Sequence, residues 1–296
     1  MDTQKEKEYL REFKKSICEL GIKSGDIVYV GSDVASVILQ AKHELGIASK
    51  DEQFEFLDAL IDSLQEIVTE AGTLLFPVYS WDFCRGKGFD HKKTQGEVGV
   101  LNNYILNKRT DFVRTQHPIY SFMTWGKDSS YLAGLKNQEA WGEASPFRYL
   151  LDNDAKQLNI NVGPLRGLTF KHYVEQYVKV PYRYPKYFIG SYTDENGVTE
   201  DRTYSMYVRD LGIEENPVRD NKEFSDLFVT ASVTFREWEM CSFGYKKLFE
   251  VLKNDFLNNG GKNIYDYGEY QIDWNDKRDR YEVGFWRDRE LVNKPE

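Results

Sequence analysis

The chain carries a short apolar run that ends in a glycine turn, Asp26-Ile27-Val28-Tyr29-Val30-Gly31-Ser32-Asp33. Residues 26–30 predict a buried strand, because the run is short, apolar and rich in β-branched side chains. The glycine turn predicts the start of a helix near Val34. The first amides of such a helix would point back at the turn. Ser32, Asp33 and Val34 are therefore candidates for contact with a ligand.

Strand and helix patterns alternate over roughly the first 190 residues. Helical spacing of apolar residues covers 4–20 and 54–68, and Ser49 with Glu52 predicts a capping box for the second of these helices. Further buried strands are predicted at 73–79, 119–125 and 157–162. This alternation predicts a layered α/β domain.

The remainder of the chain has a different pattern. Asp194-Glu195-Asn196-Gly197 predicts a hairpin turn between β-rich flanks, and helical patterns return at 221–232 and 242–257. The tail from Asp273 is charged and aromatic, which predicts an edge or cap element. We find no internal repeat and no low-complexity linker.

Composition excludes several classes of protein. The 296 residues are 41% hydrophobic and 15% aromatic, which is typical of a globular protein with a full core. No apolar run approaches the roughly 20 residues that cross a bilayer, and the polar start lacks a signal-peptide core, so we expect no membrane insertion and a cytoplasmic location. A net charge of −9 disfavours nucleic acid as a partner. Three scattered cysteines fit a reducing compartment.

The stretch Thr169-Phe170-Lys171-His172-Tyr173-Val174-Glu175 is the strongest candidate for chemistry. At 3.6 residues per turn it sets an imidazole and a carboxylate on one helical face, an arrangement that suits a general base with its own orienting group. A solvated polar face with one incidental histidine is the alternative. A metal site is disfavoured, because His43, His91 and His117 offer no matching ligand pair.

A second cluster reads Arg114-Thr115-Gln116-His117-Pro118-Ile119-Tyr120-Ser121. Proline forces an extended turn that leaves His117 and Ser121 near the entry of a strand. Ser121 lacks the glycine-flanked elbow of α/β-hydrolase nucleophiles, which favours a structural hydroxyl. His117 is equally compatible with a buried turn residue.

Two loops interleave aromatic and cationic residues, at 81–93 and 182–187. Such loops suit a phosphate-bearing ligand, although a flexible solvated loop is the alternative. Cys84 lies in the first loop as a possible acyl-enzyme nucleophile, but no sequence neighbour is an evident base.

Taken in order, several motifs resemble the aminoglycoside 3-N-acetyltransferase family over about residues 22–190. They are Gly25-Asp26-Ile27-Val28-Tyr29-Val30-Gly31-Ser32, Gly72-Thr73-Leu74-Leu75-Phe76-Pro77, Phe89-Asp90, the 114–121 cluster, Ser145-Pro146-Phe147 and the His172/Glu175 helix. The resemblance implies an acyl-coenzyme A-dependent N-acyltransferase without a metal. It also implies α/β/α layers around a central mixed sheet, with a C-terminal β-hairpin and helical extension. Residues 1–296 would then be one domain, in which 1–190 form the core with the donor and catalytic site and 191–296 pack on it.

The resemblance, which implies the roles of His172 and Glu175, and the motifs described above together give the expected roles of residues. His172 and Glu175 would be catalytic. Donor and oxyanion contacts would come from Ser32, Asp33, Val34 and Ser121. Substrate contacts would come from Trp81, Arg85, Phe89, Asp90, His117, Tyr182 and Arg183.

One departure concerns the first turn, where this chain has Gly31-Ser32-Asp33 and the family usually has His-Ser-Ser or a similar triplet. The family includes enzymes that acylate nucleotide-linked amino sugars for surface polysaccharides, and the basic-aromatic loops suit such an acceptor. Aminoglycosides are polycations and would instead call for clustered carboxylates.

The expected mechanism is direct attack by a sugar amine on a thioester. His172 would accept the amine proton, and Glu175 would fix the imidazole tautomer. Backbone amides at the start of the helix near Val34 would stabilise the oxyanion. Two rivals remain open: a non-catalytic nucleotide-sugar binding protein, and a hydrolase using His117, His172 and Ser121. The sequence leaves open the acyl group, the sugar and a possible homodimer, for which 20 tyrosines and 18 phenylalanines supply aromatic surface.

Overall fold

A computed structural model describes residues 3–210, 216–276 and 281–285. Its main sheet has seven strands in the order β10-β11-β6-β1-β2-β5-β4. The bounds are β1 (Ile27–Ser32), β2 (Thr73–Tyr79), β4 (Val113–Arg114), β5 (Tyr120–Gly126), β6 (Lys156–Ile160), β10 (Ala231–Phe235) and β11 (Trp238–Gly244). Strand β1 pairs in parallel with β2 and β6, whereas β4, β5, β10 and β11 pair antiparallel. The expected mixed sheet is confirmed.

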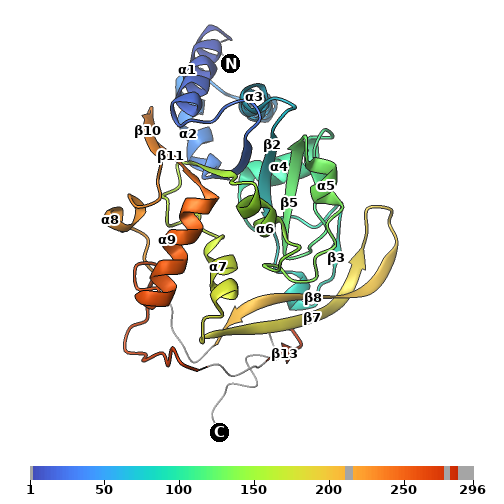
Figure 1. Cartoon of the computed structure of the whole chain (residues 1–296). Coiled ribbons are helices and arrows are strands. Elements are labelled where there is room, and N and C mark those ends of the chain that lie inside the picture. The colour runs from blue at the N-terminus through green and yellow to red at the C-terminus, as the bar shows by residue number, and fades with distance from the viewer. Residues whose placement is uncertain (1–2, 211–215, 277–280, 286–296) are drawn as a thin grey trace.

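Helices cover both faces of this sheet, so the three-layer expectation is confirmed (Figure 1). One apolar core lies under α1 (Thr3–Glu19), α2 (Val34–Leu45), α3 (Lys50–Val68) and α4 (Val100–Lys108). The other lies under α5 (Ser129–Ala133), α6 (Pro146–Asp152), α7 (Lys171–Val178) and α9 (Tyr245–Asn258). Strand β1 serves both cores, because Val28 and Val30 enter the first core and Tyr29 enters the second. Helix α3 begins at the predicted capping box of Ser49 and Glu52.

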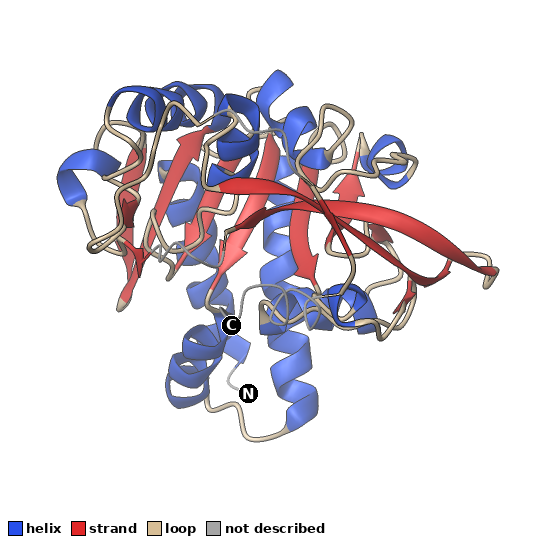
Figure 2. Cartoon of the chain, turned by 90° about the horizontal axis from the view of Figure 1, so that it is seen from below, coloured by secondary structure: helices blue, strands red, loops and turns tan. Residues whose placement is uncertain are grey.

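A second sheet is built on a long hairpin of β7 (Arg183–Thr193) and β8 (Thr199–Arg209). The turn at Asp194 is the predicted one, with Gly197 at a φ of 83°. Its two strands cross the molecule and extend beyond it on one side (Figure 2). Short strands β3 (Phe89–Asp90) and β13 (Glu282–Val283) pair in parallel with β7, so the described part of the tail does form an edge element. Strand β7 begins at Arg183, so part of this hairpin lies within the segment 1–190 that was expected to form the core.

The helical pattern at 221–232 is only partly realised. Helix α8 covers Lys222–Ser225, and β10 has begun by Ala231. The helical prediction is wrong for the end of this segment, because the residues from Ala231 extend the main sheet through pairing with β11. The remaining short elements are η1 (Phe83–Arg85), β9 (Asn216–Pro217) and β12 (Tyr265–Asp266).

Parallel pairing brings three predicted site segments to one edge of the main sheet. Strands β1, β2 and β6 end at Ser32, Tyr79 and Ile160, and their carboxyl ends point the same way. The segment after β6 leads into α7, which carries His172. Ligand sites in open α/β sheets lie at this edge.

Packing explains why residue 31 is a glycine. A Cβ on Gly31 would lie 2.9 Å from Oδ1 of Asn159, which is buried on the neighbouring strand. That oxygen accepts a hydrogen bond from Nε2 of Gln157 at 2.8 Å, and the same nitrogen lies 3.2 Å from the carbonyl oxygen of Gly167. The absent side chain therefore leaves room for an amide pair that braces the loop before α7.

We predict that Gly31→Val displaces Asn159 and lowers the free energy of unfolding by about 1–3 kcal/mol, the usual cost of overpacking a filled interior. Urea unfolding measures the loss. Gly163→Ala is the matched control, because the nearest atoms to its added Cβ are 3.9 Å away. Equal stability of the valine variant and the wild type would contradict this account of the turn.

Candidate active site

His172 and Glu175 lie one turn apart on α7 and are in direct contact. Nδ1 of His172 is 2.6 Å from Oε2 of Glu175. The carboxylate is fully buried, and the imidazole is 23% exposed. A solvated polar face is therefore excluded for this pair, because only the histidine reaches the surface.

The Glu175 carboxylate has two further partners. The hydroxyl of Tyr182 donates to Oε1 at 2.7 Å, and Nε of Arg183 lies 3.0 Å from Oε2. Tyr182 is fully buried and the Arg183 side chain is 7% exposed. We therefore correct the expectation that these two residues contact substrate: they hold the carboxylate.

The charges around the pair favour a neutral imidazole beside an ionised carboxylate. Burial lowers the pKa of His172, the Arg183 guanidinium lowers it further, and Glu175 opposes both. Burial alone would raise the pKa of Glu175, but Arg183 and His172 outweigh it and lower that pKa. An ionised carboxylate only accepts hydrogen bonds, so the contact assigns the ring proton to Nδ1 and leaves a lone pair on Nε2.

A chain of aromatic ring contacts leads from the imidazole to the loop after β2. Its members are Trp141, Tyr120 and Trp81. The ring centroid of Trp141 lies 5.4 Å from that of His172 and 4.1 Å from that of Tyr120, and Tyr120 is 6.3 Å from Trp81. Trp81 was predicted as a site residue, whereas Trp141 was missed, because a single tryptophan between two helical segments carries no local signal.

The turn after β1 supplies fewer donors than expected. The backbone N–H of Asp33 donates to the carbonyl oxygen of Ile160 at 3.0 Å, so this amide is already paired, which disfavours it as an oxyanion donor; the predicted acyl-coenzyme A contact of Asp33 stays a prediction. Its carboxylate accepts from the hydroxyl of Ser36. Val34 is the first residue of α2, where backbone amides have no partner within the helix. Oγ of Ser32 is buried and has no hydrogen-bond partner among the described residues.

Ser121 and His117 are structural. Oγ of Ser121 is buried, donates to the carbonyl oxygen of Val78 at 2.8 Å and accepts from Nε of Arg114 at 3.0 Å. His117 is fully buried, its Nδ1 accepts from the backbone N–H of Tyr120, and burial lowers its pKa to about 3. The burial of both side chains therefore disfavours the predicted donor contact of Ser121, the predicted substrate contact of His117 and a hydrolase triad through them.

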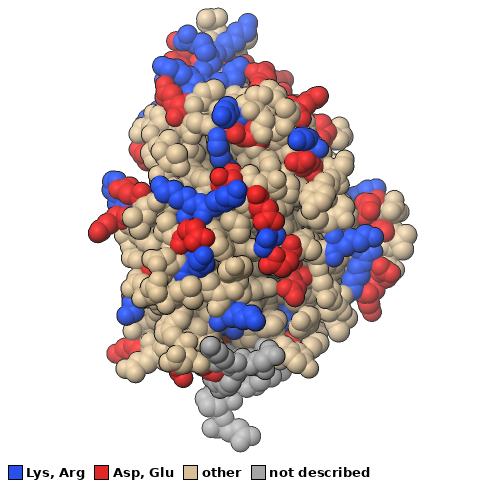
Figure 3. All heavy atoms as spheres, viewed as in Figure 1, with Lys and Arg blue, Asp and Glu red and all other residues tan. Residues whose placement is uncertain are grey.

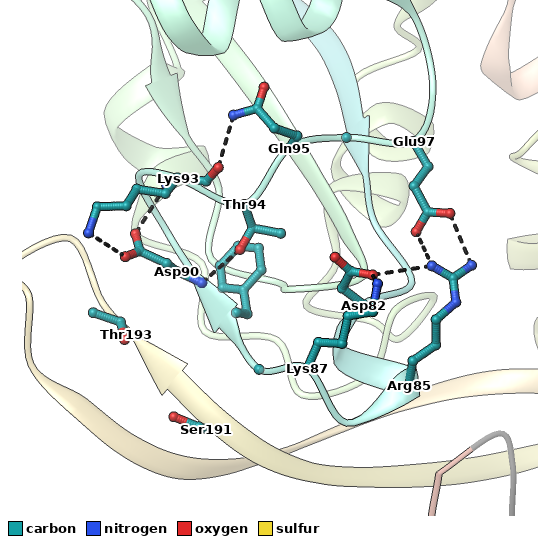
Figure 4. A pocket seen from close by; sticks show the side chains of 13 residues that line it. Asp82, Arg85, Lys87, Asp90, Lys93, Thr94, Gln95, Glu97, Ser191 and Thr193 are labelled. Atoms are coloured by element: carbon teal, nitrogen blue, oxygen red, sulfur yellow. Dashed lines mark hydrogen bonds and ion pairs between the residues drawn. The ribbon is translucent and has the colours of Figure 1, made fainter.

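A cleft of about 710 Å³ lies beside β3 and the loop after β2 (Figure 4). Its lining includes the predicted residues Arg85, Phe89 and Asp90.

The cations of the cleft are paired with carboxylates. Arg85 binds Glu97 at 2.7 and 3.0 Å, Lys87 lies 2.9 Å from Asp82, and Lys93 lies 3.2 Å from Asp90. The cleft is therefore balanced in charge. Lysine and arginine also alternate with aspartate and glutamate over the face seen in Figure 3.

The residues that the structure describes give little support to a metal site or to a cysteine nucleophile. They contain no group of three histidine, cysteine, aspartate or glutamate side chains that could hold a metal ion. The Cys84 thiol is buried, and burial raises its pKa. Among these described residues, no helix has the length and apolar character needed to cross a membrane.

The family model for aminoglycoside 3-N-acetyltransferase matches residues 48–256. A sisomicin-bound AAC-VIa structure is 19% identical with a TM-score of 0.64, covering 83% of this chain and 96% of its own.

Two further structures are similar to a comparable extent. AAC-IIIb in a binary complex with CoASH is 17% identical with a TM-score of 0.65, over 88% of this chain and 98% of its own. The YokD protein from Bacillus subtilis is 19% identical with a TM-score of 0.65, over 84% of this chain and 99% of its own. These likenesses confirm the fold. No curated protein sequence matches the chain.

We predict that Tyr182→Phe lowers the free energy of unfolding by about 2 kcal/mol, because a buried carboxylate loses a hydrogen-bond donor. Urea unfolding at neutral pH measures the change. Tyr131→Phe is the matched control, since Tyr131 is 60% exposed. Identical stabilities of the two variants would show that the Tyr182 hydroxyl does not support Glu175.

Proposed function

The chain belongs to the aminoglycoside 3-N-acetyltransferase family, and we propose that it transfers a short acyl group from acyl-coenzyme A to the amine of an amino sugar. Acetyl-coenzyme A is the cosubstrate of this family, so the reaction class is N-acyl transfer. The observation that carries the proposal is the 2.6 Å contact between His172 and a buried Glu175. It lies at the sheet edge where the strand ends meet.

His172 acts as the general base. A sugar ammonium must first lose one proton to solvent to become a nucleophile, and the attacking amine then loses a second proton, which Nε2 of His172 accepts with its free lone pair. Glu175 keeps the other ring proton on Nδ1 and stabilises the imidazolium that forms, as the acid of a catalytic triad does. Trp141 limits the orientations of the ring.

The transfer balances without a covalent enzyme intermediate. The amine nitrogen bonds to the thioester carbon, and the amine proton goes to Nε2. The resulting oxyanion lies near the start of α2, where the Val34 amide and the helix dipole favour negative charge. The carbon–sulfur bond then breaks, and the leaving thiolate recovers the proton from His172. The products are an amide and free coenzyme A.

A nucleotide-linked amino sugar is the preferred acceptor. Support comes from the loop after β2, which carries the partly exposed Trp81 together with Arg85 and Lys87. Each of these cations is paired with a carboxylate, so a phosphate would have to compete with that carboxylate for the cation. An unpaired cluster of carboxylates, which a polycation would require, does not line the described part of the cleft beside β3. An aminoglycoside is the second candidate, because a similar structure holds sisomicin.

The release of thiol from acetyl-coenzyme A, measured with different amines, tests which acceptor the protein prefers. We expect release with amine-bearing nucleotide sugars, weaker release with sisomicin, and none without an amine. Mass spectrometry identifies the acylated product. Preferred turnover of sisomicin would reverse the order of the two acceptors, release without any amine would indicate a hydrolase, and binding without release would indicate a non-catalytic protein.

We predict that His172→Ala lowers kcat by at least about 10²-fold, the scale of losing a general base, while the protein stays folded. Steady-state thiol release and circular dichroism measure the two properties. His43→Ala is the control, because His43 is exposed on α2. Near-normal turnover of the His172 variant would remove the imidazole from the reaction.

A further inference from the structure

Arg183 and His172 share one carboxylate oxygen. Nδ1 of His172 and Nε of Arg183 lie 2.6 and 3.0 Å from Oε2 of Glu175. The two nitrogens are therefore within about 6 Å of each other, the range over which one charge strongly affects the ionisation of another. Arg183 comes from β7 and Glu175 from α7, so the ion pair depends on tertiary structure.

A carboxylate next to a histidine has two opposite effects. It orients the ring, but it also attracts a proton to the ring, and a protonated imidazole cannot act as a base. The guanidinium on the same oxygen offsets the negative charge without taking the place of the histidine. Glu175 can then orient the imidazole while leaving Nε2 free of a proton.

We propose that Arg183 is a positioning residue that compensates the charge of Glu175 and so keeps His172 a neutral base. The catalytic role of this compensation rests on the proposed function. The effect of Arg183 on the ionisation of His172 can be measured whether or not the protein turns over a substrate.

The other groups that face His172 contribute less to this compensation than Arg183 does. Lys171 acts in the same direction, but its Nζ lies over the Tyr265 ring at 4.4 Å. Tyr182 donates to the other carboxylate oxygen, and Trp141 contributes an uncharged ring. Among the residues that the structure describes, Arg183 is the cation in contact with the carboxylate oxygen that binds the imidazole.

A purely structural role for Arg183 makes a different prediction. Nη1 of Arg183 donates to the carbonyl oxygen of Tyr207 at 3.3 Å, which ties β7 to β8. If that were its whole contribution, a substitution would change stability and leave the ionisation of His172 unchanged. The two roles are therefore separable by titration.

The experiment is an NMR titration of the His172 ring in wild type, Arg183→Gln and Arg183→Lys. Only 4 histidines are present, so loss of one signal in His172→Gln assigns it. We expect the pKa of His172 to rise by at least about one pH unit in Arg183→Gln and to stay near the wild-type value in Arg183→Lys. The acid limb of kcat/KM moves to higher pH in the same variant, because less imidazole is neutral there. An unchanged pKa in Arg183→Gln would overturn the proposal.

A second pair of variants covers loss of folding in Arg183→Gln. Glu175→Gln removes the buried charge that Arg183 compensates, so the double variant Glu175→Gln/Arg183→Gln has no unpaired carboxylate. We expect the pKa of His172 to be higher in the double variant than in Glu175→Gln, where Arg183 acts unopposed. Equal values would overturn the proposal. If titration shows the shift but His172→Ala keeps its turnover, the proposed function fails and the charge compensation stands.

Discussion

A fully buried carboxylate is the constraint on which this site depends. Leaving one charge in the interior is costly unless it is paired and hydrogen-bonded, and Glu175 has three partners. The hydroxyl of Tyr182 binds Oε1, and Arg183 and His172 meet at Oε2. The imidazole is thereby fixed in tautomer and direction, with one nitrogen committed to the carboxylate and the other available to a substrate.

The fold supplies this constraint from separate parts of the chain. The parallel strands β1, β2 and β6 bring three loops to one edge of the sheet, and the loop after β6 starts α7. Gly31 leaves room for the Asn159 and Gln157 amides that brace that loop. The hairpin strand β7 then delivers Arg183 to the carboxylate. Chemistry at His172 therefore requires both the main sheet and the hairpin to be in place.

Local features were predictable from the sequence, and tertiary ones were not. The strand at 26–30, the Ser49 capping box and the His172–Glu175 spacing depend on neighbours a few residues apart, and the structure has all three. The buried roles of Tyr182 and Arg183 depend on where β7 returns to α7, which no local pattern encodes. Ser121 and His117 belonged to a recognisable motif, but their exposure is set by the strands packed around them.

The protonation of the His172 ring at neutral pH is the most direct test of the central claim. Long-range ¹H–¹⁵N correlation spectra of the wild-type protein report which ring nitrogen carries a proton. The structure predicts a neutral ring with the proton on Nδ1 and a free lone pair on Nε2. A doubly protonated imidazolium, or a neutral ring with its proton on Nε2, would contradict the account.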